Sequence, residues 1–464
     1  MPANEDRTDV QELRDAVARL MPQAREELAT LVGYRSVADP AVEDPEQCRL
    51  AARWVRDAFA AEGLDARLVT TPDGSDAVIA THDGPAGAPR VLLYAHYDVQ
   101  PAPASEWTTP PFELTERDGR WYGRGAADCK GSIVAHLAAL RAVRARQAAT
   151  AGADAPPYPV SLTVVVEGSE EQGTGGLERH VEQHPEDVAA DVVVIGDVGN
   201  VAVGVPTLTV ALRGMVQVTV RVTALDGNRH SGAFGGPTPD ALAALVAMLA
   251  SLRDAEGNTT IDGLDATGTW DGAPYPAEQL ARDAGIVEGA RVIGSGSVAD
   301  HLWARPAVTI IGIDAPPVVG ALPAIQGTAA ATVSLRVPPG TDAAAAEQAL
   351  IEHLRAAAPW GVQVSFEREG IGQPFAARQD TRGFEVLSEA MADAFGAPVQ
   401  TAGQGGSIPL TAAIAAAHPD ASVVMIGVSE PASRMHSSDE SVDPGEIERM
   451  ALAEALLLTR YRHE

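Results

Sequence analysis

Two adjacent glutamates stand just beyond an apolar run, in the segment TVVVEGSEEQGTGG, where Glu170 and Glu171 follow Glu167. Two like charges side by side repel each other, and one carboxyl group tends to keep its proton unless a cation lies nearby. Most such pairs lie in solvated turns, so the pair alone does not predict a site. It becomes a candidate only if other metal-binding side chains reach the same place.

Four further segments place such side chains at the ends of apolar runs or in glycine-rich turns. His96 and Asp98 lie within LLYAHYDVQP, and Asp128 lies within GRGAADCKG. Asp197 directly follows ADVVVIG, and His436 follows ASVVMIGV after the loop SEPASRM. Each has an ordinary alternative: a strand-end histidine with an Asx turn, or a carboxylate that caps a helix. Their shared position is the informative feature, because open α/β sheets bind ligands at the carboxyl ends of their strands.

Two histidines and three carboxylates form a donor set of nitrogen and oxygen that suits two Zn²⁺, Mn²⁺ or Co²⁺ ions. The candidate ligands are His96, Asp128, Glu171, Asp197 and His436. Two cations would let adjacent glutamates ionise. Glu171 would then bind metal, and Glu170 would take a proton from water and pass it to a leaving amine. Asp98, two residues beyond His96, would orient that histidine.

Other candidate residues have weaker support. His180 and His184 are spaced i, i+4 in LERHVEQHPED, but the segment lacks the glutamate of a zinc helix, and we expect both side chains to be exposed and structural. Cys129 is expected to be a small buried residue. Lys130 is the only lysine among 34 basic residues, which hints that its position requires a lysine.

The elements that position these residues alternate between strands and helices. VSLTVVVEG and ADVVVIGDV are near-continuous apolar runs, typical of strands covered on both faces. Helical spacing recurs from about residue 10 to 32, in CRLAARWVRDAFAAEGL and in SIVAHLAALRAVRARQ. These patterns predict a doubly wound α/β catalytic domain in two parts, residues 1–211 and 378–464. GMVQVTVRVTA alternates with period two and opens an inserted α+β domain, residues 212–377, with a loop region over about 254–290.

Composition narrows the function. The net charge of −29 over 464 residues argues against nucleic acid and anionic membranes as partners. The sequence has no run of about 18 apolar residues, so we expect no membrane span. The acidic, polar start of the chain lacks the features of a signal peptide. Cys48 and Cys129 do not form a disulfide framework, so we expect a cytoplasmic protein.

Seven segments together resemble the dinuclear zinc peptidases, a family that includes carnosinase-like dipeptidases, aminoacylases, glutamate carboxypeptidases and succinyl-diaminopimelate desuccinylase. They are LLYAHYDVQPA, the segment from Trp107 through PPFELTERDGRWYGRGAADCKG, VVVEGSEEQGTGGL, RHSGAFGG, LRVPPG, GQGGSIP and EPASRMHSSDE. HSGAFGG and GGSIP are closest to the carnosinase-like branch. The resemblance implies two ions, most simply zinc, with His96 and Asp197 on one, Glu171 and His436 on the other, and Asp128 between them.

The resemblance also assigns roles to the inserted domain, which would act as a lid and form a homodimer. His230 would reach into the neighbouring subunit's active site and stabilise an oxyanion. Arg336, with Gly406 and Ser407, would hold the substrate's C-terminal carboxylate. Relatives often have a cis peptide after the bridging aspartate, here Asp128–Cys129. The residue directly after that aspartate is often Asp or Asn in relatives, so Cys129 is a departure. Relatives also usually have Asn or Thr near the position of Ala321, and the absence of either residue here is a second departure.

The sequence therefore predicts a dinuclear metallopeptidase that cleaves dipeptides or similar small amides with a free C-terminal carboxylate, with Glu170 as general base. An N-acyl-amino-acid amidohydrolase uses the same residues and is the alternative. A non-catalytic binding protein on this scaffold is a third hypothesis, but it would be expected to lack Glu170 or a ligand, and both are present.

Overall fold

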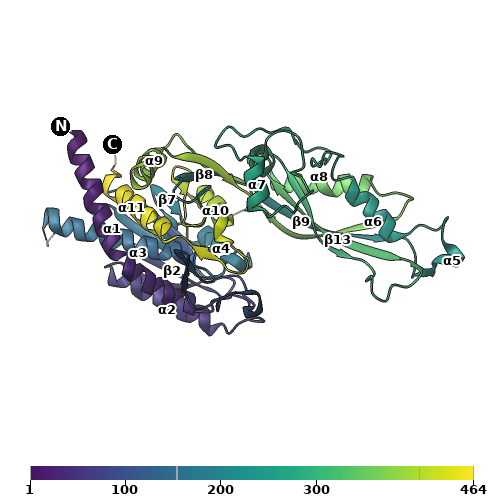
Figure 1. Cartoon of the computed structure of the whole chain (residues 1–464), viewed down its shortest axis with the longest axis horizontal. Coiled ribbons are helices and arrows are strands. Elements are labelled where there is room, and N and C mark those ends of the chain that lie inside the picture. Colours follow the sequence, from purple (N-terminus) through teal and green to yellow (C-terminus); the bar gives the residue numbers. More distant parts are fainter. Residues whose placement is uncertain (1, 153–154, 407, 463–464) are drawn as a thin grey trace. The chain divides into compact units, whose positions relative to one another are not determined.

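The computed structural model describes residues 2–152, 155–406 and 408–462 (Figure 1). The chain divides into two compact units, which we call unit 1 (Met1–Val210, Ala377–Ala402 and Ile408–Glu464) and unit 2 (Ala211–Ala376 and Gly403–Ser407). Each unit has its own hydrophobic core.

Unit 1 contains most of a mixed sheet with the strand order β1-β2-β6-β3-β7-β17-β8. β6, β3, β7 and β17 run parallel to one another, while β1, β2 and β8 pair antiparallel with their neighbours. The short strands β15 (Phe375–Ala376) and β16 (Gln400–Gln404) also pair with β8. The main strands are β1 (Asp65–Thr70), β2 (Asp76–His82), β3 (Arg90–His96), β6 (Ser161–Glu167), β7 (Val192–Ile195), β8 (Thr207–Leu212) and β17 (Ser422–Met425). The predicted α/β class is confirmed.

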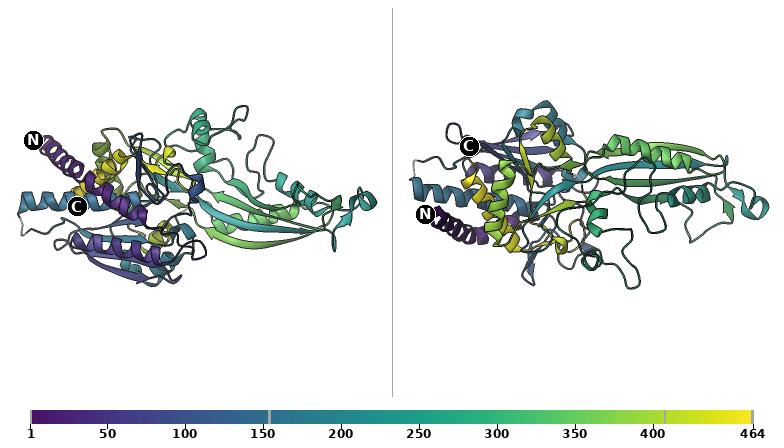
Figure 2. Two further views of the ribbon diagram at one scale, coloured as in Figure 1. Left: turned by 60° about the horizontal axis from the view of Figure 1, so that its bottom comes forward. Right: turned by 90° about the horizontal axis from the view of Figure 1, so that it is seen from above.

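Helices cover this sheet on both faces, as its sequence pattern predicts. Every residue of β6 is buried. Val164 packs into one large cluster with α1, α2, α3, α9 and α11, whereas Val165 is fully buried outside that cluster. α1, α3 and α11 lie side by side in Figures 1 and 2. The helices are α1 (Pro2–Gly33), α2 (Glu46–Ala61), α3 (Lys130–Ala151), α4 (Gly176–Gln183), α9 (Arg382–Phe395), α10 (Pro409–Ala417) and α11 (Pro444–Arg460).

The parallel strands bring the candidate residues to one edge of the sheet. β3 ends at His96, β6 ends just before the turn with Glu170, and β7 ends just before Asp197. Short elements complete this unit: η1 (Ala104–Glu106), β4 (Thr115–Arg117), β5 (Arg120–Tyr122), η2 (Glu170–Gln172), η3 (Pro185–Val188), η5 (Pro431–Ser433) and β18 (Ser441–Val442). Because parallel strands end on the same side, the loops after them share that edge.

Unit 2 is built on an antiparallel sheet with the order β11-β13-β9-β14. Burial alternates along β9, and its buried valines pack against α6 and α8, as period two predicts. The prediction of a loop over about 254–290 was only partly right, because this segment contains helix α7. The elements are β9 (Gly214–Thr223), β10 (Arg229–His230), α5 (Ser231–Phe234), α6 (Ala241–Ala250), α7 (Ala277–Asp283), η4 (Asp300–Ala304), β11 (Ala307–Asp314), β12 (Ala324–Ile325), β13 (Thr328–Val337), α8 (Ala343–Ala356) and β14 (Gln363–Gly372).

Candidate active site

The five side chains predicted as metal ligands meet in one cluster of unit 1. Asp128 lies between the two histidines: its Oδ1 is 3.0 Å from His96 Nε2, and its Oδ2 is 3.0 Å from His436 Nε2. Asp197 Oδ1 lies 3.2 Å from His96 Nε2, and Glu171 Oε2 lies 3.1 Å from His436 Nε2. The cluster therefore has two halves that share the carboxylate of Asp128.

Asp98 supports this cluster in two ways. Its backbone carbonyl accepts a hydrogen bond from His96 Nδ1 at 3.0 Å, which turns Nε2 of that ring towards the carboxylates. Its carboxylate oxygen Oδ1 lies farther from Nδ1, at 3.5 Å. The carboxylate instead accepts the backbone amides of Glu170 at 3.1 Å and Glu171 at 2.9 Å. The sequence analysis missed this second contact, which holds the turn carrying both glutamates.

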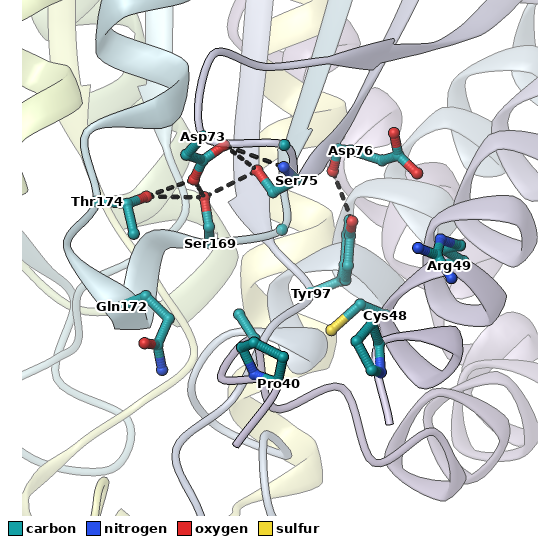
Figure 3. Close-up of a pocket in the computed structure, with 14 residues that line it drawn as sticks. Pro40, Cys48, Arg49, Asp73, Ser75, Asp76, Tyr97, Ser169, Gln172 and Thr174 are labelled. Carbon is teal, nitrogen blue, oxygen red and sulfur yellow. Dashed lines mark hydrogen bonds between the residues drawn. The ribbon is translucent and has the colours of Figure 1, made fainter. Parts of the chain in front are cut away.

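The same turn is anchored by a hydroxyl network centred on Asp73 (Figure 3). Ser169 Oγ and Ser75 Oγ each donate to the Asp73 carboxylate at 2.8 Å, and Thr174 also donates to it. A cavity of about 350 Å³ lies beside this network, lined in part by Ser169, Thr174 and Tyr97. The residues before and after Glu170 and Glu171 are thus tied to the Asp73 loop.

The two adjacent glutamates have different environments. Glu171 Oε2 accepts a hydrogen bond from Gln100 Nε2 at 2.8 Å and also faces His436. In the part of the chain that the structure describes, the Glu170 carboxylate makes no hydrogen bond. Burial, and then the charge of Asp197, raise the pKa of Glu170 well above its usual value. A partly buried carboxylate without a partner is suited to exchange protons with a substrate or water.

The cluster retains protons when no cation balances its charge. The hydrogen bonds that His436 donates to the carboxylates of Asp128 and Glu171 raise the pKa of this histidine to about 10. Burial raises the pKa of Asp197 to about 6. Burial would also raise the pKa of Asp128, but the hydrogen bonds from His436 and His96 outweigh it and hold that pKa well below its usual value. These nitrogen and oxygen donors lie close enough to share a proton, and a metal ion that binds them would displace it.

The residues after Asp128 are buried beneath the cluster. Cys129 Sγ donates to the Gly196 carbonyl at 3.1 Å, and burial raises the pKa of this thiol well above its usual value. Although Sγ lies within 4.8 Å of donor atoms of His96 and Asp197, a thiol with this pKa is a poor ligand. The peptide bond between Asp128 and Cys129 is cis.

Lys130 occupies the first position of α3 and is fully buried. Its Nζ donates to the carbonyls of Leu31 and Tyr34, at 2.9 Å each, at the carboxyl end of α1. Burial lowers the pKa of Lys130 to about 7. The lysine thus joins α1 to the segment that carries Asp128, a contact that the sequence could only hint at.

His136, His180 and His184 of unit 1 have partners other than the candidate ligands. The expected exposure of His180 was wrong: this side chain is buried, and its Nε2 lies 2.8 Å from Asp187 Oδ2, while His184 is exposed. His136 is fully buried and its Nδ1 lies 2.9 Å from the Glu454 carboxylate. Neither His180 nor His136 belongs to a metal-sized group among the described residues.

The other predicted site residues belong to unit 2, and one of them, Ser407, lies outside the described residues. His230 is exposed, and its Nδ1 accepts a hydrogen bond from the Ala233 amide at 3.2 Å. Arg336 lies on β13 and is partly buried. Arg213, which the sequence analysis did not single out, is buried with an unpaired Nε, and burial and the charge of Arg336 lower its pKa to about 10.

The donor set of the cluster fits two divalent cations. Each half brings one imidazole Nε2 within 3.0–3.2 Å of two carboxylate oxygens, so the donors converge on a common point. Imidazole nitrogen and carboxylate oxygen are ligands that Zn²⁺ accepts readily. The hydrogen bond from His96 Nδ1 to a carbonyl is the arrangement that leaves Nε2 available for a metal.

Comparison with known proteins identifies the family. The sequence model of Peptidase family M20/M25/M40 matches residues 92–460. The chain belongs to this family. All five candidate ligands lie within the matched region. The cysteinylglycine-S-conjugate dipeptidase of Corynebacterium striatum is 44% identical over 416 residues, which cover 89% of this chain and 90% of that protein.

Relatives with lower sequence identity are also dipeptidases. The Cys-Gly metallodipeptidase dug1 of Schizosaccharomyces pombe is 30% identical over 338 residues, 69% of each chain. The fold resembles the solved structures of Dug1p from Saccharomyces cerevisiae (TM-score 0.80, 23% identity, 97% of this chain and 98% of that chain) and human carnosine dipeptidase 1 (TM-score 0.79, 24% identity, with the same coverage). The predicted resemblance to the carnosinase-like branch is confirmed. No described helix is long and apolar enough to cross a membrane.

Proposed function

We propose that this chain is a dinuclear metal-dependent dipeptidase that removes the C-terminal residue from small peptides with a free carboxylate. The observation that carries the proposal is the pair of donor groups that share Asp128, next to a glutamate without a hydrogen bond. His96 and Asp197 would hold one ion, Glu171 and His436 the other, and Asp128 would bridge them. We propose Zn²⁺ as the native metal, on the basis of the donors.

The ions would supply Lewis acidity that polarises the substrate carbonyl and lowers the pKa of water. Glu170 would take the proton from the attacking water and deliver it to the nitrogen of the leaving amino acid. Its partly buried carboxylate, which has no hydrogen bond among the described residues and a raised pKa, supports this role. Asp98 would keep Glu170 in place by accepting the backbone amide of that residue at 3.1 Å.

Arg336 would bind the C-terminal carboxylate of the substrate, with Gly406 and Ser407. Arg213 adds a second cation: a Cβ at Gly405 would lie 2.8 Å from its Nη2, so this arginine packs against the glycine-rich turn. No ion pair is formed by Arg213 or Arg336 within the described chain. Two arginines without a carboxylate partner support recognition of an anionic group.

Unit 2 would also form a homodimer and act as a lid. β11 is an edge strand of its sheet, and Ile310, Ile311 and Ile313 on it are 46%, 54% and 49% exposed. An exposed apolar edge favours pairing with another chain. His230 would then serve the neighbouring subunit: because Nδ1 accepts a hydrogen bond, the neutral ring carries its proton on Nε2 and can donate it to an oxyanion.

The first substrates to test are S-substituted cysteinylglycines, on which the Corynebacterium striatum relative is named to act. A panel should compare them with unsubstituted Cys-Gly, β-alanyl-histidine and N-acyl-amino acids, using protein loaded with Zn²⁺, Mn²⁺ or Co²⁺. Preference for dipeptides supports the proposal, whereas exclusive cleavage of N-acyl-amino acids would favour the amidohydrolase alternative. No turnover by metal-loaded protein on any substrate would favour a binding protein.

We also propose a cytoplasmic location. Cys48 and Cys129 are both free thiols, which supports a reducing compartment. Fractionation of the producing cells, with immunodetection of the chain in the soluble and secreted fractions, tests this proposal. Recovery in the secreted fraction would contradict it.

A further inference from the structure

The loop that carries His436 has a backbone that needs external support. Arg434, His436 and Asp439 have positive φ angles of 56°, 60° and 58°, a region that residues other than glycine rarely adopt. The side chain of His436 is 55% exposed, so its own packing does not hold it. A loop with this backbone keeps one shape only if its neighbours fix it.

Glu440, at the end of this loop, is fully buried, and both of its carboxylate oxygens accept hydrogen bonds. Its Oε2 accepts Arg124 Nη1 at 2.7 Å and the Gly125 amide at 3.0 Å. Its Oε1 accepts the Ala127 amide at 3.0 Å and the Asp128 amide at 3.1 Å. We call these five residues the Glu440 clamp. The clamp binds the backbone of the residue that lies between the two histidines.

Further contacts join the same two loops. The Gly123 amide donates to the Glu440 carbonyl at 3.0 Å, and Arg124 Nη2 donates to the Ser437 carbonyl at 3.2 Å. Ser437 directly follows His436. The arginine therefore holds both the clamp carboxylate and the backbone beside the histidine. Asp439 gives the loop a separate anchor by accepting the Thr108 amide at 2.9 Å.

We propose that Glu440 is a positioning residue that sets the separation of Asp128 and His436, and thereby the affinity for the ion between Asp128, Glu171 and His436. The inference rests on the proposed function, because it presumes the dinuclear site. Glu440 lies in the same loop as His436, and Arg124 joins its carboxylate to the Ser437 carbonyl beside that histidine, so its effect falls mainly on the half of the cluster that contains His436.

A carboxylate is required at this position because all four hydrogen-bond partners of the Glu440 side chain are donors, and each needs an oxygen acceptor. In Glu440→Gln, one oxygen becomes an amide NH₂ group, which cannot accept a hydrogen bond. In either orientation two of the four donors lose their acceptor, and buried unpaired donors force the loop to move. Changes to groups that hold metal ligands in place typically lower metal affinity about 10- to 100-fold.

The test measures metal affinity and the ligand field for the wild type, Glu440→Gln and Glu440→Asp. Glu62→Gln is the matched control: Glu62 is also a buried carboxylate, its Oε1 accepts Arg141 Nε at 2.7 Å, and it lies outside the cluster. Metal-free proteins are titrated with Co²⁺ while the visible spectrum is recorded, and Zn²⁺ content is measured after dialysis against buffered metal. Thermal unfolding of the metal-free proteins reports folding.

In both Glu440 variants we expect one ion to bind as in the wild type and the other at least about tenfold more weakly, with an altered Co²⁺ spectrum. Glu62→Gln should bind both ions normally. Unchanged affinity for both ions in the Glu440 variants would overturn the proposal. Equal loss of both ions, or failure of both variants to fold, would overturn it too, because Glu440 would then serve general stability. A wild type that binds no metal would instead refute the proposed function.

Discussion

The Nε2 atom of His436 lies 3.1 Å from Oε2 of Glu171. This contact distinguishes Glu171 from Glu170, whose carboxylate makes no hydrogen bond in the described structure. We therefore propose different roles for these chemically identical neighbours: Glu171 would bind metal, and Glu170 would transfer protons.

Glu170→Gln should retain both ions while turnover falls at least about 10²-fold, because the amide cannot accept the proton of water. Metal content by mass spectrometry and kcat on a Cys-Gly conjugate measure the two effects. Glu171→Gln is the matched variant and should lose the ion beside His436. Loss of metal from the Glu170 variant alone would reverse the two assignments.

A substrate with an amidated C-terminus should be cleaved at least about 10²-fold less efficiently than the free acid, because the arginines would be left without their anion. The ratio of kcat/KM for the two substrates measures this selectivity. In Arg336→Met the ratio should approach one, since the free acid loses its partner. Equal cleavage of both substrates by the wild type would remove Arg336 from the site.

Mixed dimers should reveal which subunit His230 serves. Glu170→Gln and His230→Ala dimers should each be nearly inactive. If His230 acts on its neighbour, one site of the mixed dimer carries both lesions and the other is intact, so about half of the wild-type activity returns. Differently tagged subunits, purified through both tags, provide the mixed dimers. No recovery in verified mixed dimers would place His230 in its own subunit's site or outside catalysis.

Binding of metal should release protons at neutral pH. The neighbouring carboxylates raise the pKa of His436 to about 10, so without an ion it is protonated at pH 7 and must lose this proton to bind one. Apparent affinity should thus rise with pH, by up to about tenfold per unit for each proton released. Calorimetric titrations in buffers of different ionisation enthalpy count these protons, with His184→Gln as a control. Heats that do not depend on the buffer would contradict the expected release.

The same shift affects the stability of the metal-free fold. The pKa of His436 is raised above its ordinary value of 6.5 to about 10. Its contribution is therefore fully present below pH about 6.5 and is lost as the pH rises towards 10. The difference in unfolding temperature between the wild type and His436→Gln should narrow over that range. A constant difference across the range would show that the His436 proton does not stabilise the fold.

His96, Glu171 and Asp197 were predicted as candidate ligands because they lie close to the ends of strands with a strong local signal. Asp128 and His436 lie farther from a strand end, in a glycine-rich turn before α3 and in the loop after β17. The apolar runs before His96 and Asp197 identify parallel strands, and the strand-end rule brings their loops together. The structural supports were not predictable, because their partners are remote. The Glu440 carboxylate contacts the Asp128 amide across 312 residues, and His136 contacts Glu454 across 318. Contacts between positions this far apart in the sequence leave no local pattern of residue types.

The burial of Lys130 has a practical consequence for chemical labelling. This lysine is the only one in the sequence, and its Nζ is enclosed at the end of α1. In the folded chain, acylating reagents and ubiquitin-transferring enzymes therefore meet no open lysine side chain. Acylation at residue 130 would require α1 to separate from α3. The rate of this modification, followed by peptide mass spectrometry, would thus report how often the packing of these two helices opens.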